Sequence, residues 1–378
     1  MSRLEELIAE LCPNGVEYKM LGDIGRVAMC KRILKNETSS ENGVPFYKIG
    51  TFGKEADAYI SYEKYIEYKS KYSFPQKGDI LISAAGTIGR TVIYNGEDAY
   101  YQDSNIVWLE HDRSQVMNKY LFYCYQLKPW NVSSGGTIAR LYNDNINKAK
   151  IPVPPLPIQE EIVRILDKFA ELTAELTAEL TKRKQQYQYY TEHLFSDDTN
   201  AIVPLGDVAD IGTGSSNTNE ETEDGEYPFF VRSQEVRKKD TWEYDETAII
   251  TAGDGVGVGK VFHYVEGKYA LHQRAYRINI TDKNILPKYF FYYMKNTFFS
   301  YITRNAVHAS VTSIRRRMLD NYPVPVPPLE EQERIVAILD RFDALCNDLT
   351  SGLPAEIEAR KKQYEYYRDK LLTFKEAV

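Results

Sequence analysis

The sequence predicts an α+β fold in which two strand-rich globular domains alternate with two long helices that pair as an antiparallel coiled coil, with pseudo-twofold symmetry. Three observations support this fold: a segment of 18 residues occurs twice, coiled-coil spacing follows each copy, and short β-branched and aromatic runs fill the remainder. The expected domains are an N-terminal helix (1–12), a first globular domain (13–150), a central helix (151–196), a second globular domain (197–322) and a C-terminal helix (323–378).

The duplicated segment begins with a proline-rich lead-in and continues as a helix. Residues 152–169 read PVPPLPIQEEIVRILDKF and residues 325–342 read PVPPLEEQERIVAILDRF, and 13 of the 18 positions agree. Shorter motifs recur around it in the same order: MLGDIG with PLGDVA, VPFYKI with YPFFVR, ILISAAGTIGR with IITAGDGVGVGK, NKYLFYCY with PKYFFYYM, and GGTIARL with HASVTSI. Self-similarity over so long a period indicates one structural plan used twice.

Strands are expected in each globular domain where β-branched and aromatic residues run between Gly, Asn and Asp turns. The first domain supplies GDILISA, RTVIYN and NIVWLE, and the second supplies TAIITA, KVFHYV and AYRINI. A helix is expected at NKYLFYCYQL in the first domain and at PKYFFYYMKN in the second. Strands outnumber helices, so each domain is predicted to be α+β and dominated by strands.

The helices after the two proline-rich segments carry apolar residues in alternating steps of four and three. The first copy has Ile158, Ile162, Ile165, Phe169, Leu172 and Leu176, and the second has Ile335, Ile338, Phe342, Leu345 and Leu349. This spacing is typical of a coiled-coil seam, and the expected partner of each helix is its twin. The run Ser351-Gly352-Leu353-Pro354 is expected to break or kink the second helix.

The N-terminal helix corresponds to the end of the central helix. When the two copies are aligned on their LGD motifs, residues 3–11 match residues 187–195. The first copy therefore begins with the last turns of a helix, as in a circular arrangement. Residue 1 is expected to lie near residue 378.

Composition places the chain in a broad class. The 378 residues contain 43% hydrophobic residues, enough for two or three buried cores, and no run of 18 apolar residues that would predict a transmembrane helix. Cys12, Cys30, Cys124 and Cys346 are far apart, which favours buried thiols in a reducing, cytoplasmic compartment. The net charge of −7 argues mildly against nucleic acid, although an acidic chain can still carry a basic face.

Few residues suggest catalysis. The five histidines, His111, His193, His263, His272 and His308, show no metal-ligand spacing with cysteines or carboxylates, and G-x-S-x-G is absent. The run GDGVGVGK (253–260) fails both the P-loop pattern and the dinucleotide fingerprint. We interpret it as a glycine hairpin, with a backbone contact to a phosphate such as that of DNA as the alternative. No cofactor and no metal are expected.

Basic and hydroxyl side chains are the better candidates for function, because Arg, Lys, Ser and Thr read phosphates and base edges. Arg315-Arg316-Arg317 is the densest cationic run. Ordinary solvated charges are the alternative for many of these positions. The candidate DNA-binding residues are Lys31, Arg32, Lys48, Arg90, Thr137, Arg140, Arg232, Arg237, Lys238, Lys260, Arg274, Arg304, Thr312, Arg315, Arg316 and Arg317.

Taken together, these motifs resemble the specificity subunits of type I restriction–modification systems over essentially the whole chain. The resemblance is carried by the paired PVPPL helices, the LGD openings, the glycine turns that end in Arg90 and Lys260, and the unit Thr-Ala-Glu-Leu at 173–176 and 177–180. It implies two target recognition domains (13–150 and 197–322), each reading one half of an asymmetric bipartite site in double-stranded DNA. The second helix departs from the pattern because it lacks Thr-Ala-Glu-Leu and is interrupted.

The resemblance also implies partners. The helices would set the gap between half-sites and dock two modification subunits that carry an S-adenosylmethionine-dependent adenine methyltransferase. A restriction subunit would add ATP-driven translocation and cleavage. The chain itself would be non-catalytic, which fits its lack of a P-loop and of an N-P-P-[YF] or D-P-P-Y methyltransferase motif. No membrane partner is expected.

Two other classes of function remain open. One is a two-domain coiled-coil scaffold that binds no nucleic acid, which a failure to bind any duplex at low salt with partners present would favour. The other is a self-sufficient nuclease or methyltransferase, which activity of the purified chain alone would favour.

Overall fold

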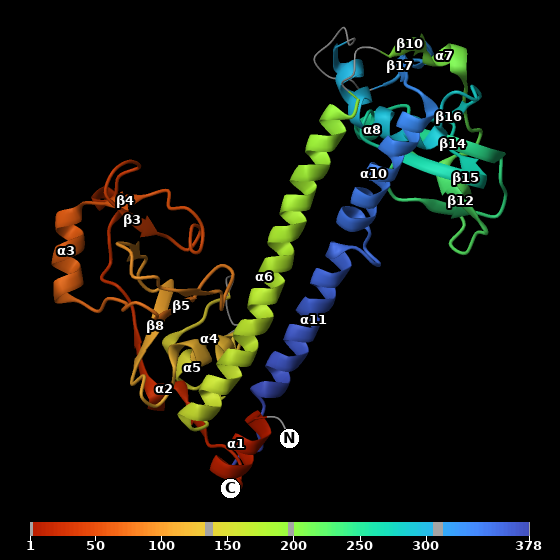
Figure 1. Ribbon diagram of the computed structural model, residues 1–378. Coiled ribbons are helices and arrows are strands. Elements are labelled where there is room, and N and C mark those ends of the chain that lie inside the picture. The colour runs from red at the N-terminus through yellow and green to blue at the C-terminus, as the bar shows by residue number, and fades with distance from the viewer. Residues whose placement is uncertain (1–2, 133–138, 196–199, 305–312, 378) are drawn as a thin grey trace. The chain divides into compact units, whose positions relative to one another are not determined.

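The computed structural model describes residues 3–132, 139–195, 200–304 and 313–377 (Figure 1). The chain forms two compact units: unit 1 comprises 1–175 and 358–378, and unit 2 comprises 176–357. Each unit contains one strand-rich globular domain and parts of the long helices, as the sequence predicts.

Unit 1 contains three sheets. A four-stranded sheet has the order β2-β8-β5-β6, a three-stranded sheet has the order β4-β3-β7, and β1 pairs with β9. The predicted strands GDILISA, RTVIYN and NIVWLE form β5, β6 and β8 of the first sheet, and the predicted helix NKYLFYCYQL forms α4. In chain order the elements are α1 (Arg3–Leu11), β1 (Tyr18–Met20), α2 (Leu21–Ile24), β2 (Gly25–Ala28), the 3₁₀ turn η1 (Lys35–Glu37), β3 (Val44–Tyr47), β4 (Tyr59–Ile60), α3 (Tyr62–Lys71), β5 (Ile80–Ser83), β6 (Thr91–Ile93), β7 (Tyr100–Tyr101), β8 (Ile106–His111), α4 (Asn118–Gln126), α5 (Asn143–Asn147) and β9 (Lys150–Pro152).

Unit 2 is built around one larger sheet. Six strands follow the order β11-β16-β14-β15-β12-β13, and β10 pairs with β17. The predicted strands of the second domain form β14, β15 and β16, and the predicted helix forms the start of α8. In chain order the elements are β10 (Ala201–Pro204), α7 (Leu205–Val208), β11 (Ala209–Thr213), η2 (Thr218–Glu220), β12 (Tyr227–Phe230), β13 (Arg237–Lys239), β14 (Tyr244–Ala252), η3 (Gly255–Gly257), β15 (Phe262–Leu271), β16 (Ala275–Ile280), α8 (Pro287–Arg304), α9 (Arg316–Asp320) and β17 (Pro323–Val326).

The central strands are continuously apolar because each of their faces covers a different core. In β5, Ile80 and Ile82 pack into one core of unit 1, while Leu81 between them packs into another. In β14, Ile249 and Ile250 divide in the same way between two cores of unit 2. Successive side chains of a strand point to opposite faces, so a strand covered on both faces shows no polar alternation.

The long helices are α6 (Leu156–His193), α10 (Leu329–Asn347) and α11 (Leu353–Leu371). The predicted interruption of the second helix is confirmed, but it lies at residues 348–352, between α10 and α11, because Leu353 and Pro354 already form the first turn of α11. The Asp348 carboxylate caps this turn by accepting hydrogen bonds from the backbone N–H groups of Thr350, at 2.7 Å, and of Ser351, at 3.2 Å. Leu349, which the seam pattern includes, instead lies in the turn with 80% of its surface exposed.

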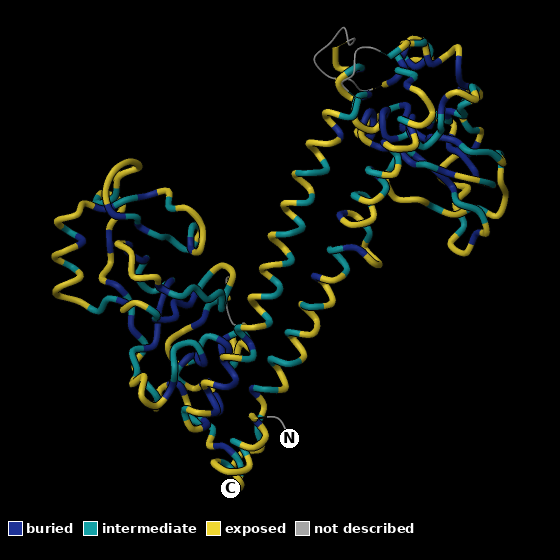
Figure 2. Tube along the Cα trace, in the orientation of Figure 1, coloured by how far each residue is buried: buried dark blue, intermediate teal, exposed yellow. Residues whose placement is uncertain are grey.

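The first turns of α6 and α10 pack into the cores of their own globular domains. Ile158 and Ile162 are completely buried in the main core of unit 1, and Ile335 is buried in the main core of unit 2. A helix that covers a domain core shows the same apolar spacing as a coiled coil, so the predicted seam stays a prediction there. Figure 2 shows the buried residues gathered inside each domain, while the long helices are mostly half-buried or exposed.

Further along, aromatic residues join the twin helices within each unit. In unit 1, Phe169 of α6 stacks on Tyr367 of α11 with ring centroids 5.3 Å apart. In unit 2, Tyr187 and Tyr190 of α6 lie against Phe342 of α10, at 6.0 and 5.4 Å. These contacts support the expected pairing of twins, and a continuous coiled coil stays a prediction.

A buried glutamine explains why the PVPPL-x-x-Q segment occurs twice. In unit 1, Gln159 accepts a hydrogen bond from the backbone N–H of Met117 and donates to the carbonyls of Gln115 and Pro154. In unit 2, Gln332 makes the matching three bonds, accepting from Leu286 and donating to Asn284 and Pro327. Each glutamine is 0% exposed, so it fixes the long helix to the turn that begins α4 or α8.

A tyrosine–aspartate pair repeats about two turns further along each long helix. The Tyr123 hydroxyl donates to the Asp167 carboxylate, and the Tyr292 hydroxyl donates to Asp340 at 2.5 Å. Burial and the carboxylate acceptor raise the pKa of both tyrosines, so each hydroxyl remains a donor. The duplicated sequence therefore forms the same contacts between helix and domain in each unit.

The two terminal segments of the chain meet in unit 1, as the circular arrangement predicts, although residues 1 and 378 lie outside the described residues. The backbone N–H of Val16 donates to the Lys375 carbonyl at 2.8 Å, and that of Ala377 donates to the Val16 carbonyl at 3.0 Å. Leu4 of α1 and Leu372 at the end of α11 belong to the same core. The expected pseudo-twofold relation between the units stays a prediction.

Cys30, Cys124 and Cys346 are buried as predicted, whereas Cys12 is only half-buried. Burial raises the pKa of Cys30 and of Cys124 to about 12, so neither thiol is a ready nucleophile at neutral pH. The described helices include none that is long and apolar enough to cross a membrane.

Candidate nucleic-acid interface

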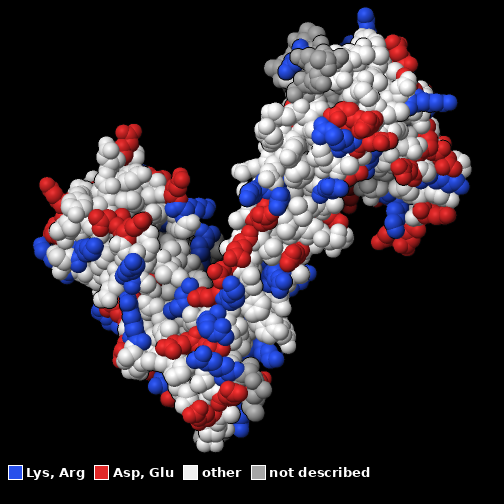
Figure 3. Space-filling view, viewed as in Figure 1, with Lys and Arg blue, Asp and Glu red and all other residues white. Residues whose placement is uncertain are grey.

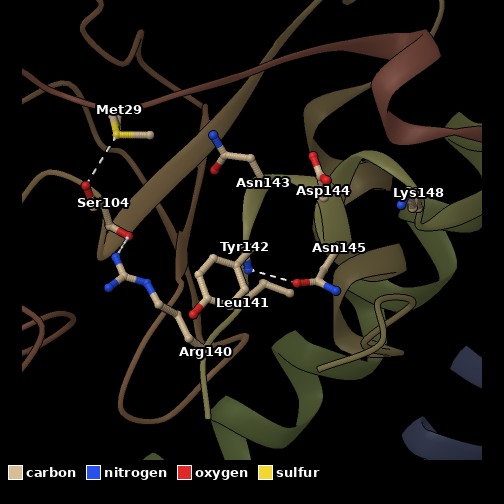
Figure 4. A pocket seen from close by; sticks show the side chains of 9 residues that line it. All are labelled: Met29, Ser104, Arg140, Leu141, Tyr142, Asn143, Asp144, Asn145 and Lys148. Atoms are coloured by element: carbon tan, nitrogen blue, oxygen red, sulfur yellow. Dashed lines mark hydrogen bonds between the residues drawn. The ribbon is translucent and has the colours of Figure 1, made fainter. Parts of the chain in front are cut away.

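Two candidate arginines of unit 1 meet at one turn. The Arg32 guanidinium donates to the Asp103 carboxylate at 2.9 Å, and the Arg140 guanidinium donates to the Ser104 carbonyl at 2.9 Å. Ser104 has φ 61°, in the left-handed region that residues other than glycine seldom adopt. Its hydroxyl lies 3.8 Å from the sulfur of Met29 (Figure 4).

A cavity of about 690 Å³ opens beside this turn. Arg140 lies over the ring of Tyr142, with 6.0 Å from its guanidinium carbon to the ring centroid. Asn143 and Asp144, from the start of α5, line the same cavity (Figure 4). Amide, carboxylate and guanidinium groups together offer the donors and acceptors that base edges require. The full lining is Met29, Ser104, Arg140, Leu141, Tyr142, Asn143, Asp144, Asn145 and Lys148.

Two candidate arginines of unit 2 meet at one carboxylate. Asp254 accepts from Arg232 at 2.6 Å and from Arg274 at 3.3 Å. The hydrogen bond from Arg232, with the charge of Arg274, lowers the pKa of Asp254, so the carboxylate stays ionised. One negative charge between two positive charges leaves this cluster with a net positive charge.

The same backbone contact follows the central strand in both units. In unit 1 the N–H of Leu141 donates to the Ala84 carbonyl at 2.9 Å, and in unit 2 the N–H of Ile314 donates to the Gly253 carbonyl at 2.8 Å. Tyr142 and Arg315 are the next residues, and each precedes a helix of five residues, α5 or α9. The last residues of the motifs GGTIARL and HASVTSI, Leu141 and Ile314, therefore occupy matching positions. The earlier residues of the two motifs fall in 133–138 and 305–312, which lie outside the described residues.

The three arginines at 315–317 differ in their surroundings. Arg316 donates to the Ile211 carbonyl at 2.5 Å and pairs with Asp320 at 2.7 Å, so it ties α9 to β11. Arg315 and Arg317 are exposed, and neither forms an ion pair with another described residue. Two of the three are therefore available to a ligand.

The other candidates do not gather in one patch. Figure 3 shows basic and acidic side chains interspersed on the face in view. Thr137 and Thr312 lie outside the described residues. Lys238 and Arg304 are exposed. The rest have partners: Lys31 over Tyr72, Lys48 with Asp57, Arg90 with the Phe52 carbonyl, Arg237 with Glu221, and Lys260 over Phe299.

Two of the described histidines bind backbone carbonyls and therefore have structural roles. His111 bonds the carbonyls of Leu109 and Val116, and His263 bonds the carbonyl of Ser233. His308 lies outside the described residues. The part of the chain that the structure describes contains no cluster of His, Cys, Asp and Glu able to hold a metal ion.

Sequence reasoning missed the residues that gather the arginines. Asp103 and Asp254 escaped notice because the search for a DNA-binding surface counted cations, and a carboxylate counts against such a surface. The run Tyr142-Asn143 follows the quoted motif GGTIARL directly, so it could have been included as a polar segment next to a candidate arginine.

Known proteins are similar to this chain in sequence. The family model of the type I restriction modification DNA specificity domain matches residues 13–183 and 198–359. The specificity subunit of the Escherichia coli type I restriction enzymes EcoR124I and EcoR124II is 37% identical over 295 residues, which are 70% of this chain and 72% of that one. A Haemophilus influenzae relative named as such a specificity subunit is 58% identical over 180 residues, about half of each chain at 47%.

Solved structures share the fold. The type I restriction–modification S subunit of M. genitalium aligns with a TM-score of 0.60 at 15% identity, covering 95% of this chain and 96% of that one. The HsdS subunit of Thermoanaerobacter tengcongensis aligns with a TM-score of 0.51 at 16% identity, covering 96% and 97%.

Proposed function

The chain belongs to the family of type I restriction–modification DNA specificity subunits, and we therefore propose that it selects the DNA site for a complex whose other subunits carry out the chemistry. One observation carries this proposal. The two units share the glutamine and tyrosine–aspartate contacts that fix their frameworks, yet at matched positions they carry different polar residues, Tyr142 and Arg315. A conserved frame with divergent polar loops suits two modules that read different sequences.

Each globular domain then reads one half of an asymmetric bipartite site in double-stranded DNA. The Asp103–Ser104 turn with Arg32 and Arg140 is the proposed contact of the first domain, and the Asp254 cluster with Arg315 and Arg317 that of the second. Guanidinium groups suit both phosphate and guanine. The remaining candidate cations contribute phosphate contacts where they are exposed.

The long helices are the proposed docking surface for two modification subunits, because α6 and α10 begin with similar sequences and so present similar faces. A restriction subunit joins the complex through those partners. The DNA partner places the chain in the cytoplasm. A scaffold without DNA binding and a self-sufficient enzyme are the alternatives that the following experiment separates.

We expect the purified chain to transfer no methyl group, and to direct adenine methylation at one bipartite sequence once a modification subunit is added. The reason is that the chain supplies recognition and the partner supplies the methyltransferase. Transfer of labelled methyl from S-adenosylmethionine to genomic DNA, followed by mapping of modified adenines, measures this. Methylation by the chain alone would indicate a self-sufficient enzyme, and a reconstituted complex that binds no duplex at low salt would indicate a scaffold.

We expect the double variant Arg315→Ala/Arg317→Ala to weaken DNA binding of the complex at every sequence and to lower its salt dependence. Each phosphate contact that is lost reduces the slope of log K against log salt by about 1. Arg316 is left in place because it holds the Ile211 carbonyl, so its removal would disturb the fold. Lys283→Ala, at another exposed position of unit 2, is the matched control. An unchanged slope in a folded double variant contradicts the proposed contact.

A further inference from the structure

The glycine run at 253–260 is confirmed as a hairpin loop, since β14 and β15 pair antiparallel up to Thr251 and Phe262. The loop displays one valine and buries another. Val256 is 97% exposed, whereas Val258 is 3% exposed and packs in the main core of unit 2. Val256 therefore contributes no packing to the fold, although a solvated apolar tip is unfavourable in water.

The base of this loop is rigidly held. The N–H of Gly253 donates to the Arg274 carbonyl at 2.9 Å, and its own carbonyl accepts from Ile314. The N–H of Arg274 donates to the His272 ring at 3.0 Å. Burial, with the charges of Arg232 and Arg274, lowers the pKa of His272, which keeps the ring neutral and able to accept.

Asp254 holds one edge of the Arg274 guanidinium, and the other edge is open to solvent. Asp254 binds its Nη1 atom, and the side chain is 60% exposed. Arg232, on the other side of Asp254, has an exposed fraction of only 40% and lines a cavity of about 330 Å³ with Arg237. Arg274 is therefore the guanidinium of the pair that is more open to solvent. Val256 lines the cavity that contains Arg232, two residues after the Asp254 that binds both guanidiniums.

These features fit a nucleobase better than a phosphate. A loop that binds phosphate through backbone N–H groups needs no apolar side chain at its tip, whereas this loop places the two methyl groups of Val256 in solvent beside a cavity that contains a guanidinium. In the major groove, a guanidinium edge matches N7 and O6 of guanine, and apolar groups match the C5-methyl of thymine. A carboxylate that holds the guanidinium in one orientation reduces the side-chain entropy lost on binding.

We propose that Arg274 and Val256 read two neighbouring bases in the half-site of the second domain. Arg274, oriented by Asp254, donates to N7 and O6 of a guanine, and Val256 contacts the C5-methyl of an adjacent thymine. This inference rests on the proposed DNA recognition and adds the bases that one loop reads.

The first domain provides an internal contrast. Ala84 and Gly253 accept the same backbone bond, and Gly86 and Gly255 both have positive φ, 63° and 80°. By this match Thr87 takes the place of Val256, and Ala85 that of Asp254. The first domain thus lacks both the carboxylate and the apolar tip, so the reading pair is confined to one half-site.

The test starts from the methylation motif of the wild-type complex with its modification subunit. For Arg274→Ala we expect discrimination at a single G·C pair to fall about fivefold to a hundredfold, with the other half-site unchanged. For Asp254→Asn we expect a smaller loss at the same pair, because the guanidinium remains but is less well oriented. Val236→Ala, at an exposed valine elsewhere in unit 2, is the control that should change nothing.

Replacing individual thymines of the duplex by deoxyuridine, which lacks the C5-methyl, tests the second contact. At one thymine beside that G·C pair we expect the wild-type complex to bind about fourfold more weakly, the effect of one buried methyl group. Val256→Ala should bind the two duplexes equally. The inference is overturned if Arg274→Ala weakens all sequences equally, which indicates a phosphate contact, or if no thymine is sensitive. A wild-type complex that selects no sequence would instead overturn the proposed function itself.

Discussion

Replacing Gln332 by alanine is expected to lower the free energy of unfolding of unit 2 by at least about 3 kcal/mol, about 1 kcal/mol or more for each of three groups that lose their partner. The change leaves the N–H of Leu286 and the carbonyls of Asn284 and Pro327 without their partner in a completely buried place. A buried donor or acceptor that loses its partner costs about 1–3 kcal/mol. Gln159→Ala should have the same effect in unit 1, because its three bonds are equivalent.

Gln332→Glu should destabilise unit 2 in a manner that depends on pH. The ionised carboxylate would still accept from Leu286 but would oppose the two carbonyls that the amide now binds. Its pKa in the folded chain is therefore raised above the unfolded value of about 4.3. The added destabilisation is fully present above the raised pKa and decreases as the pH falls towards the unfolded value.

Hydrogen exchange of the full chain measures both effects locally. Gln332→Ala should increase exchange in the peptide that contains Leu286 and leave the peptide that contains Met117 protected, and Gln159→Ala should do the reverse. Denaturant unfolding of each variant gives the size of the loss. Gln185→Ala, an exposed glutamine on α6, is the matched control. Stability equal to that of the control would show that water replaces the amide without loss.

Adding one Thr-Ala-Glu-Leu unit after Leu180 is expected to widen the gap of the methylated bipartite site by one or two base pairs, and deleting Thr177–Leu180 to narrow it. Four residues lengthen a helix by about 6 Å and turn it by about 400°, close to a full turn. DNA rises about 3.4 Å per base pair, so two base pairs are the upper bound, and tilt of the helix reduces that projection. The prediction rests on α6 being one uninterrupted helix from Leu156 to His193.

The rotation makes an internal control possible. A two-residue insertion at the same place turns the rest of α6 by about 200°. Tyr187 and Tyr190 would then face away from Phe342, and we expect loss of methylation at every gap. Mapping modified adenines for the four-residue and two-residue variants separates length from phase. Folded four-residue variants that keep the original gap would show that the repeat is only a helix-forming sequence.

The candidate site illustrates the limit of reading a chain without its fold. The sequence contains Arg232, Asp254 and Arg274, but nothing local to any of them indicates that the carboxylate binds both guanidiniums. Val256 and Val258 have the same neighbours in the run GVGVG, and only the fold of the hairpin exposes the first and buries the second. Whether a side chain is buried or exposed depends on neighbours that are distant along the chain.

The sequence by itself determined the two-copy plan, the strands and long helices, and an interruption of the second helix near Ser351, because repeats, apolar periodicity and Gly-Pro interruptions act through near neighbours. The tertiary structure alone decided that Ile158 and Ile162 pack into the core of the first domain, since a domain core and a twin helix require the same spacing. It also decided which cations meet, because an ion pair depends on the distance in space between side chains that hydrophobic cores have already placed.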